Sequence, residues 1–119
     1  MSEEIFVFGS NLAGRHGRGS AREAYEKHGA THGAGGAWGL QGRSYAIPTK
    51  DKNIRTMPLN EIEPYVKRFV EFAKEHPEMN FNIVAIGCGL AGYKPDQIAP
   101  MFLGAPTNCH FIDDWNVLG

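Results

Sequence analysis

Two side chains of this 119-residue sequence have the types needed for catalysis at a sugar or phosphate centre. Lys50 follows Pro48 and Thr49, where its amine could pair with a phosphate or, when neutral, attack a sugar carbon. His16 lies among glycines and arginines, and an ordinary imidazole pKa of about 6.5 suits a general acid at a phosphoryl or glycosyl leaving group. For each, the alternative is a solvated side chain on a surface loop. Lys50 and His16 are therefore the candidate catalytic residues.

Glycine is concentrated in two segments that each follow an apolar run. The chain has 15 glycines, of which ten lie between Gly9 and Gly42 and three more are Gly87, Gly89 and Gly92. A glycine turn that leads into a helix exposes backbone N–H groups near the positive end of the helix dipole, which favours phosphate. Two such turns on one edge of a sheet could bind two linked phosphates. The alternative is that these glycines only permit tight turns.

Neither segment completes a known nucleotide fingerprint. The spacing Gly-x-Gly-x-x-Gly occurs over residues 87–92, but the acids that could contact a ribose, Asp113 and Asp114, follow slightly late. A Walker A motif is absent. A Rossmann-like nucleotide-binding domain stays as an alternative, although its fingerprint is incomplete.

Cysteine, histidine and tryptophan add little chemistry. Cys88 and Cys109 are the only cysteines and are expected to be reduced, buried thiols. The histidines and cysteines show no ligand spacing, so we expect no metal and no cofactor. Trp38, next to a glycine-containing loop, could stack on a base or pack at the edge of the core.

Strands and helices alternate along the chain, and these elements must position the candidate residues. Apolar runs predict strands over residues 5–8, 43–47, 81–86 and 109–112. Helices are expected to begin at Ser20 and Asn60, each with Glu three residues later in a capping box, and at Pro95, while residues 30–43 form a loop. In the second of these helices, an apolar stripe is formed by Ile62, Val66, Phe69 and Ala73. This order predicts one α/β domain over residues 1–119, with a mostly parallel sheet and helices on both faces. Both glycine segments then lie at the carboxyl ends of strands, where ligands bind.

Charge and hydropathy exclude several classes of partner. Twelve Lys and Arg against 13 Asp and Glu give a net charge of -1, which argues against general nucleic-acid or membrane-surface binding. No apolar run approaches the roughly 20 residues of a membrane helix. The start of the chain lacks the basic and apolar regions of a signal peptide, so a cytoplasmic protein is expected. Arg15, Arg18 and Arg22 give the first glycine segment a local positive charge that suits a small anion.

Three short motifs occur in order along the chain. Residues 11–21 read Asn-Leu-Ala-Gly-Arg-His-Gly-Arg-Gly-Ser-Ala, residues 48–51 read Pro-Thr-Lys-Asp, and residues 86–92 read Ile-Gly-Cys-Gly-Leu-Ala-Gly. The first resembles the macrodomain pattern Asn-x-x-Gly-x-x-Gly-x-Gly-x-Ala, which follows the strand leading to the ADP-ribose site of that family. The second is similar to a segment of one macrodomain branch, which includes enzymes that remove ADP-ribose from DNA bases or protein carboxylates. The third resembles the second phosphate loop of the same branch.

The resemblance implies a macrodomain-like fold, shortened at the N-terminus because the usual first strand and helix, with an acid that recognises adenine, have no counterpart. It implies that Asn11 contacts the distal ribose of the ligand and that Lys50 faces its anomeric carbon. Some lysine-using members carry Asp where this sequence has Ala91, so only Asp51 could replace that acid. The ligand-binding residues implied are Gly9, Ser10, Asn11, Gly17, Arg18, Gly19, Ser20, Thr49, Gly87, Cys88, Gly89, Leu90, Ala91, Gly92 and Tyr93.

The sequence therefore predicts a module that binds ADP-ribose or a related nucleotide-diphosphate sugar. One hypothesis is an enzyme that hydrolyses an ADP-ribosyl bond or ADP-ribose phosphate through Lys50 and His16, with an ADP-ribosylated macromolecule as a partner. The other is a non-catalytic module that senses or sequesters such a metabolite. The absence of an acid at residue 91 weakens the first hypothesis.

Overall fold

Five strands form one sheet in the order β2-β3-β1-β4-β5 in the computed structural model, which describes residues 3–88, 91–112 and 115. Strands β1, β3, β4 and β5 pair in parallel, and β2 pairs antiparallel with β3. The strand bounds are β1 Glu3–Asn11, β2 Gly39–Gln41, β3 Ser44–Lys50, β4 Met79–Ile83 and β5 Cys109–Phe111. The predicted α/β class with a mostly parallel sheet is confirmed.

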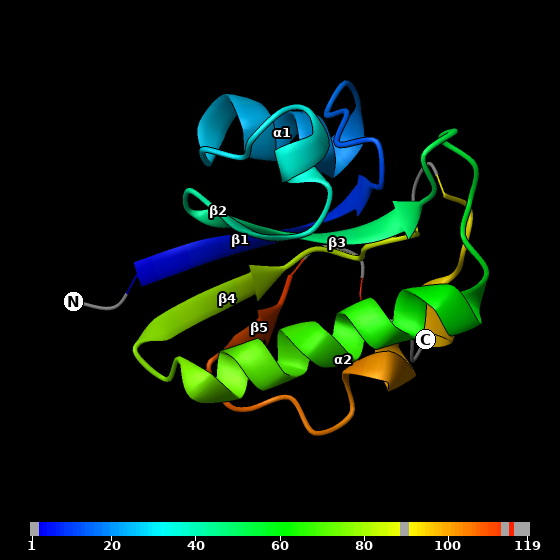
Figure 1. Cartoon of the computed structure of the whole chain (residues 1–119). Helices are drawn as coiled ribbons and strands as arrows, with labels where there is room; N and C mark the ends of the chain where they lie inside the picture. The colour runs from blue at the N-terminus through cyan, green and yellow to red at the C-terminus, as the bar shows by residue number, and fades with distance from the viewer. Residues whose placement is uncertain (1–2, 89–90, 113–114, 116–119) are drawn as a thin grey trace.

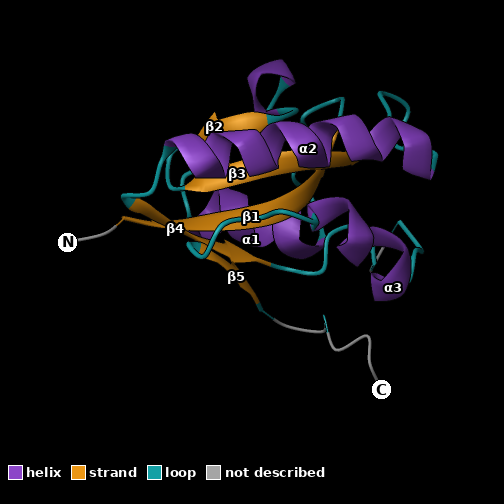
Figure 2. Cartoon of the chain, turned by 90° about the horizontal axis from the view of Figure 1, so that it is seen from below, coloured by secondary structure: helices purple, strands orange, loops and turns teal. Residues whose placement is uncertain are grey.

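Helices cover both faces of the sheet, as predicted. Helix α1 (Gly19–Lys27) lies on one face, and α2 (Leu59–Glu75) and α3 (Pro95–Ile98) lie on the other (Figure 1). Figure 2 shows α2 in front of the sheet and α1 behind it. Two 3-10 turns, η1 (Ala34–Gly36) and η2 (Ala99–Phe102), complete the helical elements described. In the described part of the chain, no helix has the length and apolar character needed to cross a membrane.

Aromatic side chains pack the sheet against these helices. The apolar run 5–8 is buried throughout because β1 is the central strand and is covered on both faces. On the α1 side, the ring of Phe6 stacks on His28 with centroids 4.3 Å apart. On the α2 side, Phe69 packs edge-on against Phe81 at 5.2 Å. The predicted apolar stripe of α2 is thus the contact between this helix and the sheet.

The predicted starts of α1 and α2 were wrong by one or two residues, whereas the predicted start at Pro95 is confirmed as the first residue of α3. Helix α2 begins at Leu59, because the extended residue Pro58 already accepts the first helical hydrogen bonds through its carbonyl. Asn60 therefore lies inside the first turn and is not the N-cap. Helix α1 likewise begins before Ser20, with Arg18 as its extended N-cap residue. In both helices the backbone entering from the preceding loop sets the start, and the predicted capping boxes do not.

The strand that carries Lys50 is longer than predicted. Strand β3 continues through Pro48 to Lys50 instead of ending at residue 47. Proline has no N–H to donate, and it is tolerated here because β2 pairs only with residues 44–46 and leaves that edge of β3 without a ladder. The segment 30–43, predicted as a loop, contains η1 and β2.

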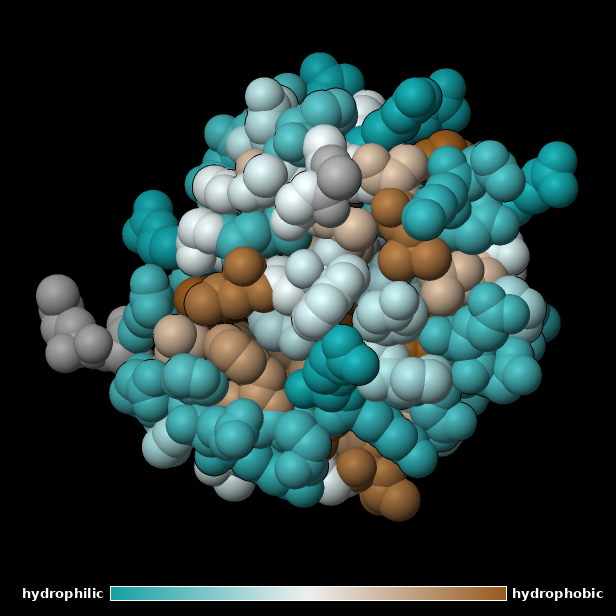
Figure 3. All heavy atoms as spheres, viewed as in Figure 1, coloured by the Kyte–Doolittle hydropathy of each residue, from teal (hydrophilic) through white to brown (hydrophobic). Residues whose placement is uncertain are grey.

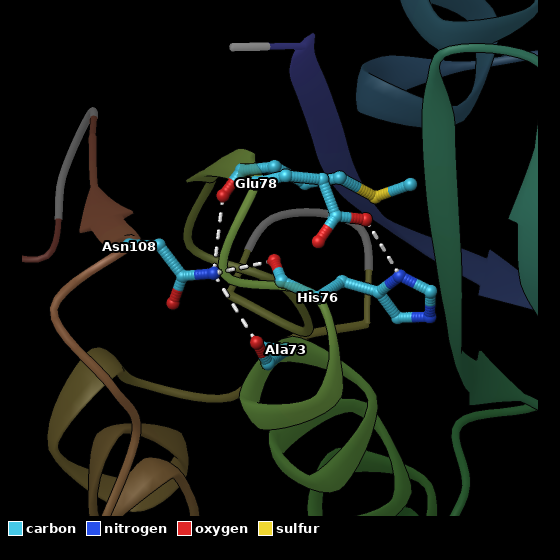
Figure 4. A network of polar contacts seen from close by, with 5 residues as sticks. Ala73, His76, Glu78 and Asn108 are labelled. Carbon is cyan, nitrogen blue, oxygen red and sulfur yellow. Dashed lines mark hydrogen bonds and ion pairs between the residues drawn. The ribbon is translucent and has the colours of Figure 1, made fainter.

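Asn108 connects the end of α2 to β4 (Figure 4). Its side-chain nitrogen Nδ2 donates to the carbonyls of Ala73, His76 and Met79 at 3.2, 3.0 and 3.0 Å. The last carbonyls of a helix have no partner inside the helix, so Asn108 provides one. The His76 ring is itself within hydrogen-bond distance of the Glu78 carboxylate, at 2.9 Å. This network fixes the return of the chain from α2 into the sheet.

Apolar residues on the surface are scattered. The exposed large ones are Tyr25, Trp38, Leu40, Ile54, Leu103 and Phe111. On the face drawn in Figure 3, hydrophobic residues form separate small patches between hydrophilic ones.

The side chain of Trp115 is bonded to the last residue of β4. Its indole N–H donates to the carbonyl of Ile83 at 2.7 Å. Trp115 thus lies against the end of β4.

Candidate functional site

A cleft of about 750 Å³ opens at the carboxyl ends of β1, β3 and β4. This is the edge at which open parallel sheets bind ligands, and the volume is in the usual range for small-molecule sites, about 300–1,000 Å³. The cleft is lined by Gly9, Ser10, Asn11, Arg15, Gly17, Arg18, Gly19, Ser20, Ala21, Thr49, Lys50, Ile54, Val84, Ala85, Ile86, Gly87, Cys88, Ala91 and Pro95.

Asn11, the last residue of β1, shapes the first wall. Its Oδ1 accepts the backbone N–H of Arg15 at 3.0 Å, and its Nδ2 donates to the Arg15 carbonyl at 2.7 Å. The two bonds close the turn that leads toward α1. A side-chain amide has two N–H groups and two oxygen lone pairs, so one N–H group and one lone pair of Asn11 remain free for a ligand. The ribose contact implied for Asn11 stays a prediction that this geometry permits.

The first turn of α1 belongs to the same wall. Gly19, Ser20 and Ala21 all line the cleft. The first N–H groups of a helix have no partner within it, and they carry the positive end of the helix dipole. This wall therefore presents hydrogen-bond donors and partial positive charge to whatever occupies the cleft.

The second wall follows β4. The N–H of Val84 donates to the Val7 carbonyl of the neighbouring strand at 3.1 Å, whereas the N–H of Ile86 donates to the Val84 carbonyl within its own segment at 2.7 Å. The strand therefore ends at Ile83 and not at residue 86 as predicted. Gly87 then has a left-handed backbone with φ +72°, which glycine adopts without a Cβ clash. A Cβ on Gly9 would lie 3.5 Å from the Gly87 nitrogen. The two glycine segments therefore meet at the floor of the cleft.

The charged side chains at the cleft are basic. Arg15, Arg18 and Lys50 line it, and among the residues that the structure describes no Asp or Glu does. Arg22, the third arginine of the predicted cluster, lies outside the lining and pairs with Glu26 on the exposed face of α1 at 3.1 Å. Positive charge without a neighbouring carboxylate favours an anionic ligand.

Asp51 does not supply an acid partner for Lys50. Its Oδ1 accepts the backbone N–H groups of Asn53 at 2.8 Å and Arg55 at 3.0 Å. These bonds, with Arg55 the larger contributor, hold the pKa of Asp51 below its usual range. Asp51 is therefore an ionised residue that closes its own turn and is absent from the cleft lining.

His16 lies behind the cleft wall and does not line it. Its side chain is 2% exposed, and neither ring nitrogen has a hydrogen-bond partner. The ring packs edge-on against Phe8 at 5.4 Å and against His32 at 5.8 Å. Burial lowers the pKa of His16. A ligand in the cleft cannot reach this ring, so the position does not suit the predicted role of general acid.

Cysteine chemistry at the site is limited. The Cys88 thiol lines the cleft and donates to the Ile86 carbonyl at 3.3 Å. Burial, and to a lesser extent the charge of Asp96, raises the pKa of Cys88. Burial raises the pKa of Cys109 to about 11. Both thiols therefore stay protonated at neutral pH. Within the described residues, no group of three or more His, Cys, Asp or Glu side chains could hold a metal ion.

Most of the predicted ligand residues come together in the cleft. They are Gly9, Ser10, Asn11, Gly17, Arg18, Gly19, Ser20, Thr49, Gly87, Cys88 and Ala91, together with Lys50. Gly92 and Tyr93 do not line it, and the Tyr93 hydroxyl donates instead to the Met57 carbonyl at 2.6 Å. Gly89 and Leu90 lie outside the described residues.

Sequence reasoning missed other lining residues. Val84, Ala85 and Ile86 belong to the predicted strand 81–86, and they reach the cleft because β4 ends at Ile83. Pro95 lines the cleft from the start of α3. Ile54 carries no local signal of a ligand site. Trp38, considered as a base-stacking residue, lies away from the cleft with the Arg68 guanidinium 4.8 Å from its ring centre.

Comparison with known proteins finds similarity of this chain to solved structures at the level of the fold. No protein-family model and no curated sequence matches the chain. A chain of Thermosipho africanus DarTG, solved in complex with ADP-ribose, has a TM-score of 0.63 at 17% identity, covering 93% of this chain and 38% of that one. A protein of unknown function from Bacteroides thetaiotaomicron has a TM-score of 0.66 at 14% identity, covering 94% of this chain and 89% of the other.

These likenesses show that the chain shares its α/β fold with both proteins. At 17% and 14% sequence identity, the similarity extends to the arrangement of strands and helices and does not assign roles to individual residues. Because this chain spans 38% of the DarTG chain, it corresponds to one part of that protein.

Proposed function

We propose that the cleft binds ADP-ribose or a related nucleotide-diphosphate sugar. The observation that carries the proposal is the meeting of the two glycine segments at the ends of β1 and β4, beside three basic side chains and the first turn of α1. Backbone N–H donors, a helix dipole and flanking cations are the features that bind linked phosphates. The likeness in fold to a chain solved with ADP-ribose supports the choice of ligand.

We further propose that the cleft binds this ligand without cleaving it. Lys50 is well placed to pair with a phosphate or sugar oxygen, but the acid that would accompany a lysine nucleophile has no candidate among the described lining residues. The Asp51 carboxylate already accepts hydrogen bonds from the backbone of its own turn, and His16 is buried behind the first wall of the cleft. The module then recognises the free metabolite or an ADP-ribosylated macromolecule.

Calorimetric titration with ADP-ribose, AMP and NAD under identical conditions tests the proposal. We expect ADP-ribose to bind at least tenfold more tightly than AMP, because AMP lacks the second phosphate and the distal ribose. Added ADP-ribose should also raise the melting temperature of the protein, since a ligand that binds only the folded state stabilises that state. A folded protein that gives no heat and no thermal shift with ADP-ribose would refute the proposed function.

A further inference from the structure

Ile54 has a backbone conformation that its side chain disfavours. Its φ is +61°, and it is the only residue other than glycine with positive φ in the part of the chain that the structure describes. A β-branched side chain in this left-handed region clashes with its own backbone, so such residues are genuine outliers. Strain of this kind persists only where the surrounding structure enforces it, and it is concentrated at functional sites.

Hydrogen bonds within residues 51–57 enforce this conformation. The Asp51 N–H donates to the Arg55 carbonyl at 2.8 Å, and the Ile54 N–H donates to the Asp51 carbonyl at 3.1 Å. The Asp51 carboxylate adds its two bonds to the backbone of the same turn. The Met57 N–H then returns to the Thr49 carbonyl at 2.9 Å. These bonds close residues 51–57 into a rigid strap on the end of β3.

Two further bonds attach the strap to the opposite wall. The Thr56 hydroxyl donates to the Ala91 carbonyl at 2.9 Å, and the Tyr93 hydroxyl donates to the Met57 carbonyl at 2.6 Å. Since β1 lies between β3 and β4 in the sheet, a link from the end of β3 to the turn after β4 passes across the end of β1. In Figure 1 the loop after β3 runs beside the loop that precedes α3.

The side chain of Ile54, which this strap places at the cleft, is not part of the hydrophobic core. Ile54 is 39% exposed, is absent from the buried core cluster, and lines the cleft. The fold therefore holds an exposed apolar residue in a strained conformation at the mouth of a cationic cleft. The hydrogen bonds of the strap offset this cost in the free protein, and a ligand that buries Ile54 would in addition remove its apolar surface from water.

We propose that Ile54 is a specificity-determining residue of the cleft, and this inference rests on the proposed function. Its side chain packs against the C–H face of a ring attached to the diphosphate, at the β3 end of the cleft. Phosphates alone gain nothing from such a contact, so Ile54 distinguishes a nucleotide-diphosphate sugar from simpler phosphates. Whether the ring is the nucleoside or the second sugar is resolved by comparing ADP with ADP-ribose.

The test separates strain from ligand contact with substitutions at Ile54. Ile54→Gly and Ile54→Asn both accept a left-handed backbone and both remove the apolar surface. We expect both variants to have a higher denaturant midpoint than the wild type and at least fivefold weaker binding of ADP-ribose. Ile54→Val keeps the branched apolar surface and should lose less affinity than either. Leu40→Asn is the matched control, since Leu40 is 45% exposed on β2, outside the cleft.

Each outcome has a distinct meaning. Weaker binding of ADP-ribose and ADP alike would assign the contact to the nucleoside, and weaker binding of ADP-ribose alone would assign it to the second sugar. ADP-ribose affinity within twofold of the wild type in both Ile54→Gly and Ile54→Asn would overturn this inference and leave the proposed function intact. A wild type that does not bind ADP-ribose would overturn the proposed function, and this inference with it.

Discussion

The side-chain amide of Asn11 and the backbone of Arg15 hydrogen-bond in both directions, at 3.0 and 2.7 Å. This relationship makes one side chain responsible for the shape of the first glycine segment. It also positions the Arg15 side chain, which lines the cleft, relative to the end of β1. We therefore expect Asn11 to act on a ligand both directly and through the turn that it closes.

Substitution of Asn11 should weaken both ligand binding and folding. Asn11→Ala removes two side-chain bonds to a partly buried turn, and net hydrogen bonds contribute about 0.5–1.5 kcal/mol each to stability. We expect a loss of about 1–2 kcal/mol in the free energy of unfolding and at least a tenfold loss of ADP-ribose affinity. Asn11→Asp keeps the acceptor but places a negative charge beside the phosphates, and should bind still more weakly. Equal affinities for wild type and Asn11→Ala would show that the turn does not need this amide.

Gly17 allows ligand approach to be tested without disturbing the fold. It lines the cleft, has no positive φ, and a Cβ added there would meet nothing within 4 Å. Gly17→Val should therefore unfold at the wild-type denaturant concentration, while its side chain blocks the ligand and weakens ADP-ribose binding at least tenfold, about 1.4 kcal/mol. Gly35→Ala, outside the cleft and with only an ordinary contact to Thr31, is the control. Unchanged affinity in Gly17→Val would place the ligand elsewhere.

Lys50 distinguishes binding from catalysis. If its amine pairs with the ligand, Lys50→Ala should weaken ADP-ribose binding by a charge-assisted hydrogen bond, about 1.5–3 kcal/mol, and Lys50→Arg should partly restore it. If the amine is a nucleophile, neither variant should release ADP-ribose from modified DNA or carboxylates, since a guanidinium stays protonated. We expect the first result. Turnover by wild type that both substitutions abolish, with affinity intact, would contradict it.

His16 should make the fold sensitive to acid. Because burial lowers the pKa of His16, the unfolded chain takes up a proton as the pH falls below about 6.5, while the folded chain still resists it. Stability should therefore be complete above that pH and decrease below it, by at most about 1.4 kcal/mol per pH unit. Urea unfolding of wild type and His16→Phe from pH 7.5 to 5 measures this. The stability of the wild type should fall relative to that of His16→Phe as the pH decreases. Parallel profiles would show that His16 titrates normally.

Local patterns in the sequence predicted much of this molecule. The run at residues 5–8 and the stripe of α2 specified a buried strand and an amphipathic helix, because hydrophobic periodicity is a property of neighbours along the chain. The glycine segments after β1 and β4 were found for the same reason. Their meeting at one edge follows from the parallel direction of β1 and β4, whose carboxyl ends lie on the same side of the sheet. Helix starts were predicted less well, since the loops that enter α1 and α2 override capping preferences.

The sequence by itself determined an α/β domain with two glycine turns and three basic residues, Lys50 among them, near the ends of its parallel strands. Only the tertiary structure decided what surrounds each side chain. The segment 30–36 folds over His16, so that a Cβ on Gly36 would lie 2.7 Å from its Nε2, and removes this ring from the site. The strap 51–57 is fastened to Ala91 and so brings Ile54 to the cleft. Such contacts join residues far apart in the chain, and no local periodicity encodes them.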